Sequence, residues 1–198
     1  MLKKLALISI YGVSAFALHT AEININDKDL ELSAKFDMGQ FNDNVEPNTI
    51  FVGGKFLKGD EKNSEPNNAN IDPYLEANFL VKKEIGNRGL SFGMGVKANY
   101  TKNYASIPLG AEFGFKIPAQ NLIPMYLNGA IYYAPTVLCF NDAKDFVEYR
   151  ISYDIEVIEN AMVTLGYRQL NTNYDTANNS LGDYIYNNSW FIGFKFSF

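Results

Sequence analysis

The sequence is poor in the side chains on which most enzymes and metal sites depend. It contains one cysteine, Cys139, and one histidine, His19, among 198 residues. A single cysteine excludes an internal disulfide and any zinc site built from several thiolates. A single histidine close to the N-terminus leaves no good general base for Ser–His or Asp–His chemistry at neutral pH. We therefore expect no enzyme activity, no catalytic residues, no metal and no cofactor.

Long apolar runs are also lacking. The longest covers residues 5–18, which is 14 residues, and it follows Lys3 and Lys4. A helix that spans a bilayer needs ~20 residues. Residues 1–17 are therefore predicted to be a secretory signal peptide that ends at Ala17, with Ala21 as the alternative last residue. No later run is as long, so residues 18–198 can cross a membrane only as a closed β-barrel.

Positive charge is in short supply as well. The chain has 17 Lys and Arg residues against 22 Asp and Glu residues. Removal of residues 1–17 takes away Lys3 and Lys4 and no acid, which leaves 15 basic and 22 acidic residues and a net charge of −7. An acidic chain of this kind is a poor ligand for a phosphate backbone, so no nucleic-acid partner is expected.

The sequence is rich in alternation between apolar and polar residues. In residues 190–198 every second side chain is large and apolar, and this period of two indicates a strand. Two segments run for 12 and 13 residues, 90–101 and 105–117. Strands in soluble proteins have ~5–6 residues, whereas tilted membrane strands need ~9–11. The nine alternating segments are 30–38, 50–57, 75–82, 90–101, 105–117, 125–133, 147–157, 161–168 and 190–198.

Nine strands would be an odd number, whereas bacterial single-chain barrels have even numbers. The long connections 59–72, 135–144 and 171–189 are predicted at one end of the barrel, with the chain ends at the other. In this arrangement the segment 30–38 runs toward the end that holds the chain termini, so one more strand must precede it, and residues 18–26 supply that strand. We predict an all-β, antiparallel, up-and-down transmembrane barrel of ten strands, with eight as the alternative. Pro108 cannot donate a backbone hydrogen bond, so a bulge or a late strand start is expected there.

The faces opposite the apolar ones carry charges of both signs. Because an unpaired buried charge is costly, we expect these groups to pair and largely fill the lumen. Small barrels are filled by side chains, and open channels appear at 16–18 strands. The alternative is a charged pore, which interior glycines would favour by leaving room for water. The inward charges are Lys35, Lys55, Lys82, Lys97, Lys116, Arg150, Arg168 and Lys195 against Glu31, Asp37, Glu76, Glu112, Glu148, Asp154 and Glu156. The predicted ion-pair network comprises Glu112, Lys116, Glu148, Arg150, Asp154, Glu156, Arg168 and Lys195.

Aromatic residues gather near the predicted strand ends, as they do at membrane interfaces. Such a girdle is predicted to include Tyr100, Tyr104, Tyr132, Tyr133 and Trp190. The closing strand ends on an aromatic residue and is similar to the C-terminal signature that the barrel-assembly machinery reads during insertion. The predicted assembly signal consists of Trp190, Phe194, Phe196 and Phe198.

Four short motifs together suggest a family. They lie at residues 132–135, 146–150, 165–168 and 193–198, and their order and spacing resemble the YfaZ family of bacterial outer-membrane proteins over residues 74–198. The resemblance implies an outer-membrane β-barrel with a signal peptide and no assigned biochemical activity. It implies no catalytic or binding residues.

The combined expectation is an integral protein of the bacterial outer membrane with a structural or surface role, or one of limited transport. The alternative is a porin-like channel for small solutes, and a barrel enzyme is the third and least favoured hypothesis. The expected partners are outer-membrane lipid and, during insertion, the barrel-assembly machinery. Small solutes are further candidate partners.

Overall fold

The computed structural model describes residues 19–27, 29–59, 73–86, 88–102, 104–118, 123–141, 143–174 and 183–198. The predicted signal segment, residues 1–17, lies outside these ranges. Within them, no helix is long and apolar enough to cross a membrane.

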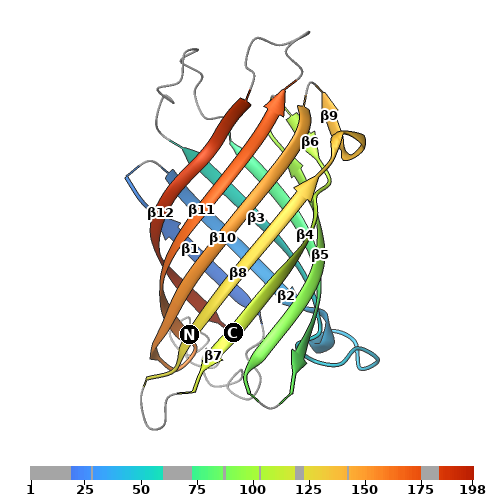
Figure 1. The fold of residues 1–198 in the computed structure, drawn as a ribbon. Helices are drawn as coiled ribbons and strands as arrows, with labels where there is room; N and C mark the ends of the chain where they lie inside the picture. The colour runs from blue at the N-terminus through green and yellow to red at the C-terminus, as the bar shows by residue number, and fades with distance from the viewer. Residues whose placement is uncertain are drawn as a thin grey trace, which may run out of the picture.

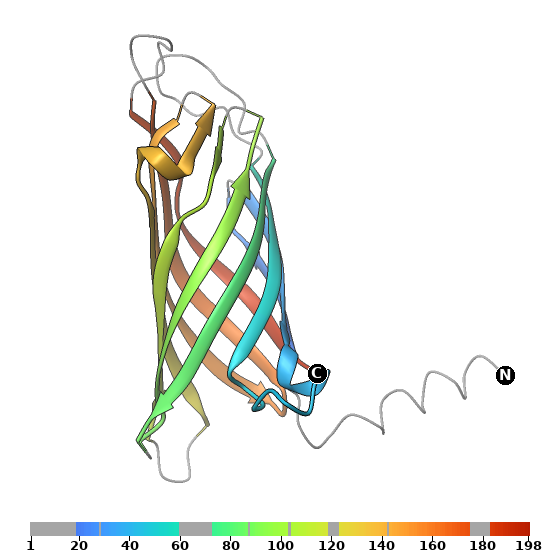
Figure 2. The same cartoon turned by 90° about the vertical axis from the view of Figure 1, so that its right-hand side faces the viewer.

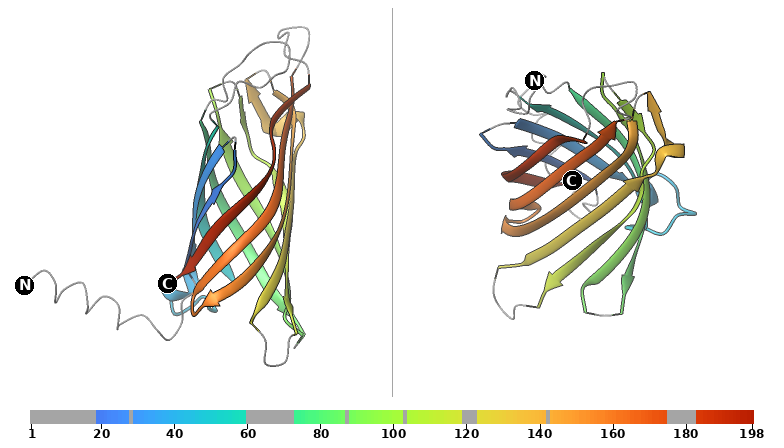
Figure 3. Two further views of the ribbon diagram at one scale, coloured as in Figure 1. Left: turned by 90° about the vertical axis from the view of Figure 1, so that its left-hand side faces the viewer. Right: turned by 45° about the horizontal axis from the view of Figure 1, so that its top comes forward.

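Ten strands form a closed antiparallel barrel, which confirms the predicted fold and strand number. They are tilted against the long axis of the barrel (Figures 1 and 3). The ten strands are β1 (Thr20–Ile25), β2 (Asp29–Asp37), β3 (Ile50–Gly59), β4 (Tyr74–Ile85), β5 (Leu90–Tyr100), β7 (Leu109–Ile117), β8 (Met125–Ala134), β10 (Ala143–Ile158), β11 (Ala161–Tyr174) and β12 (Asp183–Ser197). Two further strands, β6 (Tyr104–Ser106) and β9 (Cys139–Asn141), pair with each other at one rim.

The barrel closes because its first and last strands pair. The register of β1 against β12 runs from Thr20 opposite Ser197 to Ile25 opposite Ile192. Around the ring the order is β1, β2, β3, β4, β5, β7, β8, β10, β11, β12, so β10 lies across the lumen from β3. Every neighbouring pair in the ring is antiparallel.

The two ends of the barrel differ. The start of β1 and the end of β12 lie at the lower end in Figures 1 and 2, which we call the turn end. There β10 and β11 are joined by the two residues Glu159 and Asn160, and Asn160 has a positive φ of 64°. The opposite rim, the loop end, carries β6, β9 and the 3₁₀-helix η2 (Thr136–Leu138).

One connection at the turn end is longer than a tight turn. It follows β2, begins with the 3₁₀-helix η1 (Met38–Gln40) and ends before Ile50. Asp37 accepts hydrogen bonds from the backbone N–H of Gly39 at 3.0 Å and of Asn48 at 2.7 Å. Asp37, which we predicted as an interior charge, therefore holds this connection instead.

Two predicted segments differ from the structure. The prediction of one strand over 105–117 is wrong, because the ladder breaks at Ile107 and Pro108 and β7 begins only at Leu109. The late strand start expected at Pro108 is confirmed. The carbonyl of Pro108 accepts a hydrogen bond from the N–H of Lys97 at 2.9 Å. The predicted connection 171–189 is shorter than expected, because β11 continues to Tyr174 and β12 begins at Asp183. Polar residues extend these strands because their backbones pair in the ladder.

The outer surface carries an apolar band of half-exposed large side chains from every strand of the ring. A continuous band of this kind is the surface that a barrel presents to lipid. Strands β10 to β12 have 16, 14 and 15 residues, more than the ~9–11 that cross a bilayer, so they extend beyond the apolar band. Members of the apolar band include Ile23, Leu32, Val52, Phe79, Phe92, Phe113, Ile131, Ile151, Leu165 and Ile192.

Two neighbouring substitutions in β10 test which face meets lipid. Ile151 is 47% exposed on the outer face, whereas Ser152 is 5% exposed and faces the lumen. We expect Ile151→Arg to cost about 2–4 kcal/mol of folding free energy in liposomes, because arginine in mid-bilayer is poorly solvated. Ser152→Arg should cost less, since its side chain enters a polar interior. Equal losses in equilibrium unfolding experiments would contradict the assignment of the two faces.

Candidate functional site in the barrel interior

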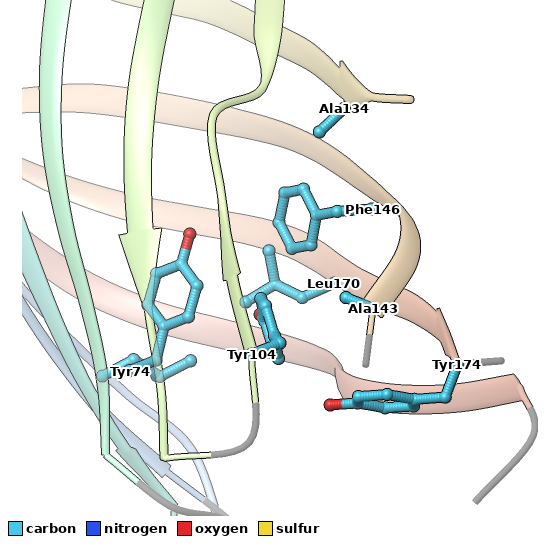
Figure 4. Packing of buried hydrophobic residues seen from close by; sticks show 8 residues of the cluster. Tyr74, Tyr104, Ala134, Ala143, Phe146, Leu170 and Tyr174 are labelled. Carbon is cyan, nitrogen blue, oxygen red and sulfur yellow. The ribbon is translucent and has the colours of Figure 1, made fainter. Parts of the chain in front are cut away.

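The interior is filled in layers, and the layer at the loop end is apolar. Its side chains converge from β3, β4, β6, β8, β10 and β11 (Figure 4). The ring of Tyr104 packs against the rings of Phe146 and Tyr174, with centroid distances of 5.9 and 6.4 Å. Solvent does not reach most of these side chains, so the layer closes the barrel at this level. The upper cluster consists of Leu57, Tyr74, Tyr104, Ala134, Ala143, Phe146, Leu170 and Tyr174.

A belt of ion pairs lies beneath the upper cluster. Lys55 Nζ is 2.8 Å from Glu148 Oε1 and 3.0 Å from Glu76 Oε2. Lys97 Nζ is 2.5 Å from Glu148 Oε2 and 3.4 Å from Glu76 Oε1. Each carboxylate therefore bridges both ammonium groups, and Glu148 reaches them across the lumen from β10. All four residues are buried.

Two arginines complete the belt. Arg150 donates to Glu31 Oε1 at 2.6 Å and to Glu22 Oε1 at 2.5 Å. Arg168 donates to the other oxygen of Glu31 and to Asp29 Oδ1, the latter at 2.6 Å. Glu31 thus binds both guanidinium groups. Charge-assisted hydrogen bonds of this kind are the strong ones, and they satisfy groups that water cannot reach.

Neutral side chains donate further hydrogen bonds to these carboxylates. Asn24 Nδ2 donates to Glu31 Oε1 at 2.7 Å. Asn187 Nδ2 donates to Asp29 Oδ2 at 2.6 Å and its Oδ1 accepts from Arg168 Nε at 2.9 Å. The belt is therefore a hydrogen-bonded network that links β1, β2, β11 and β12, because each of these strands contributes at least one of its members.

Interior glycines make room for aromatic rings. A Cβ atom at Gly110 would meet the ring of Tyr132, and one at Gly166 would meet the ring of Phe191. Lys97 Nζ lies 3.9 Å from the centroid of the Tyr132 ring, and the two guanidinium groups lie 4.7 and 5.4 Å from that of Phe191. These are cation–π distances. At these two positions the missing side chain is replaced by an aromatic ring and not by an aqueous passage.

Beneath the belt the interior opens into a cavity of about 520 Å³, the lower cavity. Its lining runs from the belt to Ser197 at the turn end, and it includes no member of the upper cluster. Two ion pairs lie in its wall. Lys35 Nζ is 2.8 Å from Glu112 Oε2, and Lys195 Nζ is 2.5 Å from Asp154 Oδ2. The interior is thus closed toward the loop end and hollow toward the turn end.

Comparison with known proteins identifies the family. The family profile described as "YfaZ precursor" matches residues 2–198. The chain belongs to the YfaZ family. The resemblance predicted from residues 74–198 is confirmed, and it extends over the N-terminal strands as well.

Two further comparisons place this YfaZ barrel among other proteins. Among curated proteins, none matches its sequence. A solved structure described as "KdgM porin" is similar, with 7% identity, a TM-score of 0.45, and coverage of 91% of this chain and 98% of that one.

Within the YfaZ barrel, six of the eight residues named for the lumen network take part in ion pairs. They are Glu112, Glu148, Arg150, Asp154, Arg168 and Lys195. The other two lie near the turn end and contact Tyr126 instead. Lys116 Nζ is 5.7 Å from the centroid of the Tyr126 ring, and the Tyr126 hydroxyl donates to Glu156 Oε2 at 3.4 Å. Neither has an ion-pair partner among the described residues.

The four residues named as an assembly signal all face outward from the closing strand. Their exposed fractions are between 45% and 67%. They are Trp190, Phe194, Phe196 and Phe198. The aromatic girdle is wrong in two places, because Tyr104 and Tyr132 point inward and are buried. Both were assigned by their nearness to strand ends, and the alternation within β8 would have placed Tyr132 on the inner face.

Two ligands of the arginines were missed in the sequence. Glu22 lies in β1, and Asp29 is the first residue of β2. The signal for Glu22 was available, because Ile23 and Ile25 face outward and the residue before them must then face inward. Asp29 gave no such signal, since it lies between the predicted strands 18–26 and 30–38.

The YfaZ barrel places its histidine away from the lower cavity. His19 stacks on Phe41 with a centroid distance of 5.1 Å, and its Nδ1 accepts from the N–H of Asp37 at 3.0 Å. It does not line the cavity. Within the described ranges, no group of three or more His, Cys, Asp or Glu side chains could hold a metal ion.

Removing Arg168 tests the strength of the belt. Its side chain is fully buried and pairs with Glu31 and Asp29. We expect Arg168→Ala to cost about 3–5 kcal/mol of unfolding free energy, because two buried carboxylates lose a partner. Lys195→Ala is the matched comparison and should cost less, since Lys195 is partly exposed and pairs only with Asp154. Similar losses for the two variants in urea unfolding from liposomes would show that burial does not set the cost.

Proposed function

We propose that the protein is an integral outer-membrane barrel with a structural or surface role and with a lumen that does not conduct. One observation carries the proposal: side chains that cross the lumen at two successive levels are fully buried. In the upper cluster these include Tyr104 and Phe146, and in the belt they include Glu148 and Arg168. A continuous aqueous channel would leave such side chains in contact with water. Barrels of this size are commonly filled by side chains.

The location in the outer membrane is supported by three features. The outer face carries an apolar band, nine of the ten ring strands have the 9 or more residues that cross a bilayer, and the ring has no open edge. The family to which the chain belongs is described as a precursor, which agrees with the signal peptide predicted for residues 1–17. In this proposal the turn end, where β1 begins and β12 ends, faces the periplasm, and the loop end faces outward.

We propose further that the protein is not an enzyme. The support is the chemistry of the lower cavity, whose ionisable residues are lysines, carboxylates, Arg150 and Tyr126. Its carboxylates are bound by lysines or arginine, apart from Glu84 at the rim. His19, the residue best suited to a general base near neutral pH, stacks against Phe41 outside the cavity.

A porin-like channel is the second candidate, and the lower cavity is the observation in its favour. The cavity already leads from the turn end to the belt. Conduction would then require only that the belt and the upper cluster move aside. Conductance in planar bilayers decides between the two candidates.

We predict that the purified protein shows small or no conductance. Removing one of the two buried layers, the upper cluster or the belt, should not open the lumen, because the other layer remains. Tyr104→Ala with Phe146→Ala thins the upper cluster, and Lys55→Ala with Glu148→Ala thins the belt while Lys97 keeps Glu76 as its partner. Each pair alone should stay closed, whereas all four changes together should conduct.

The control for these variants is Val137→Ala, an exposed substitution in η2 at the loop end. Heat-modifiable migration in gels shows that each variant is folded. A large, steady conductance of the unmodified protein would contradict the closed lumen and would favour the channel.

A further prediction concerns the closing strand and insertion. Phe198→Ala keeps the backbone pairing with His19, whose carbonyl accepts from Phe198 N–H at 2.9 Å, and removes only the aromatic ring. We expect a lower yield of folded protein in the outer membrane, because the terminal ring is the proposed address for the assembly machinery. Phe140→Ala removes an equally exposed ring at the loop end and should leave the yield unchanged. Equal yields for the two variants would contradict an assembly role for Phe198.

A further inference from the structure

The lower cavity holds more cationic groups than the ion-pair pattern of the barrel accounts for. Four lysines line it on the turn-end side of the belt. Two of them have a carboxylate partner: Lys35 pairs with Glu112, and Lys195 pairs with Asp154. The four lysines are Lys35, Lys82, Lys116 and Lys195.

Lys82 is the lysine whose position calls for a ligand. It lies on the inner face of β4, lines the cavity and forms no ion pair with any carboxylate of the described residues. Lys35 and Lys195 act on it with charge of the same sign, and Glu112 and Glu84 act on it with charge of the opposite sign. Glu112 is already engaged, because its two oxygens accept from Lys35 and from the hydroxyl of Tyr132. Glu84 is exposed at the rim.

The other negative charges that line the cavity are also engaged. Glu22 is bound by Arg150, and Glu76 and Glu148 belong to the belt. Asp154 accepts from Lys195 at 2.5 Å and from Asn128 Nδ2 at 2.9 Å. The space around Lys35, Lys82 and Lys195 therefore carries an excess of positive charge. The whole lining holds seven basic and six acidic side chains, and an excess of positive charge within low-dielectric walls attracts anions.

We propose that the lower cavity binds a small phosphate-bearing solute through Lys82, with Lys35 and Lys195 as the flanking ammonium groups. Lysine presents a compact charge with three donors, and it is a common ligand of phosphate oxygens. The volume of about 520 Å³ is that of a small-molecule site. The solute enters from the turn end, since the upper cluster closes the other end. The inference depends on the cavity and its charges and not on whether the barrel conducts.

The test is a titration of the purified, folded barrel in neutral detergent at low ionic strength with inorganic phosphate, measured by calorimetry. Lys82→Gln should weaken binding by about fivefold or more, the loss expected for one ammonium contact. No carboxylate loses an ion-pair partner in this variant, so the fold should be preserved. Lys82→Arg keeps the charge and should retain most of the affinity.

The matched control is Lys83→Gln. Lys83 is the next residue of β4, lies on the outer face and is exposed. Its substitution changes the net charge by the same amount and should leave phosphate binding unchanged. Equal losses for the two variants would mean that phosphate responds only to overall charge, and this would overturn the proposal.

A second arm separates a free solute from a lipid headgroup. Mixed micelles that contain phosphatidylglycerol present the same phosphate chemistry on a lipid. Binding of inorganic phosphate that depends on Lys82 supports the proposal. Binding of phosphatidylglycerol without any binding of inorganic phosphate would overturn it, as would the absence of binding in both arms.

Discussion

The pairing of β1 with β12 is the constraint on which the rest of the structure depends. Lipid offers no hydrogen-bond partner, so a sheet in a membrane must have no free edge. The register from Thr20 opposite Ser197 to Ile25 opposite Ile192 removes that edge and fixes the ring at ten strands. Because side chains alternate along each strand, closure also assigns every second residue to the lumen. The interior charges follow from this assignment, since a shift of one residue would expose them to lipid.

A ring of ten strands then has to be filled from within. The fill differs from level to level: aromatic and aliphatic side chains at the loop end, a network of ion pairs in the middle, and a cavity at the turn end. The ion pairs join strands that are far apart in the ring, such as Lys55 of β3 and Glu148 of β10. They hold opposite walls at a fixed separation, and Gly110 and Gly166 let Tyr132 and Phe191 occupy the space between. A polar interior also makes the lumen face of each strand chemically different from its apolar outer face. An apolar interior would leave the two faces alike.

The fold could be predicted from the sequence because alternation is a local signal. It located the ring strands to within a few residues at most ends, and parity supplied the tenth strand. The errors arose where the local signal fails. Residues 171–173 and 183–185 extend two strands by pairing with each other. Tyr104 was assigned to the girdle by its nearness to a strand end, although alternation around Ala105 places it inward with Ser106. The ion-pair partners could not be predicted, because Arg168 and Glu31 are 137 residues apart and meet only through the ring order.

The pairing of interior cations follows their access to water. Arg168, Lys55 and Lys97 have side chains at most 6% exposed, and each binds two carboxylates. Lys35 and Lys195 are 34% and 18% exposed, and each binds one. Arg150 departs from this trend, because it is 17% exposed and its two-pronged guanidinium group binds both Glu22 and Glu31. This gradient is expected from desolvation, since a charge without water needs protein partners, whereas a hydrated charge does not. Lys82 has no carboxylate partner among the described residues, and it lines the cavity. Its solvation must therefore come from water or from an anion in that cavity, and an anion would add to the partial offset that Glu112 and Glu84 provide against the repulsion from Lys35 and Lys195.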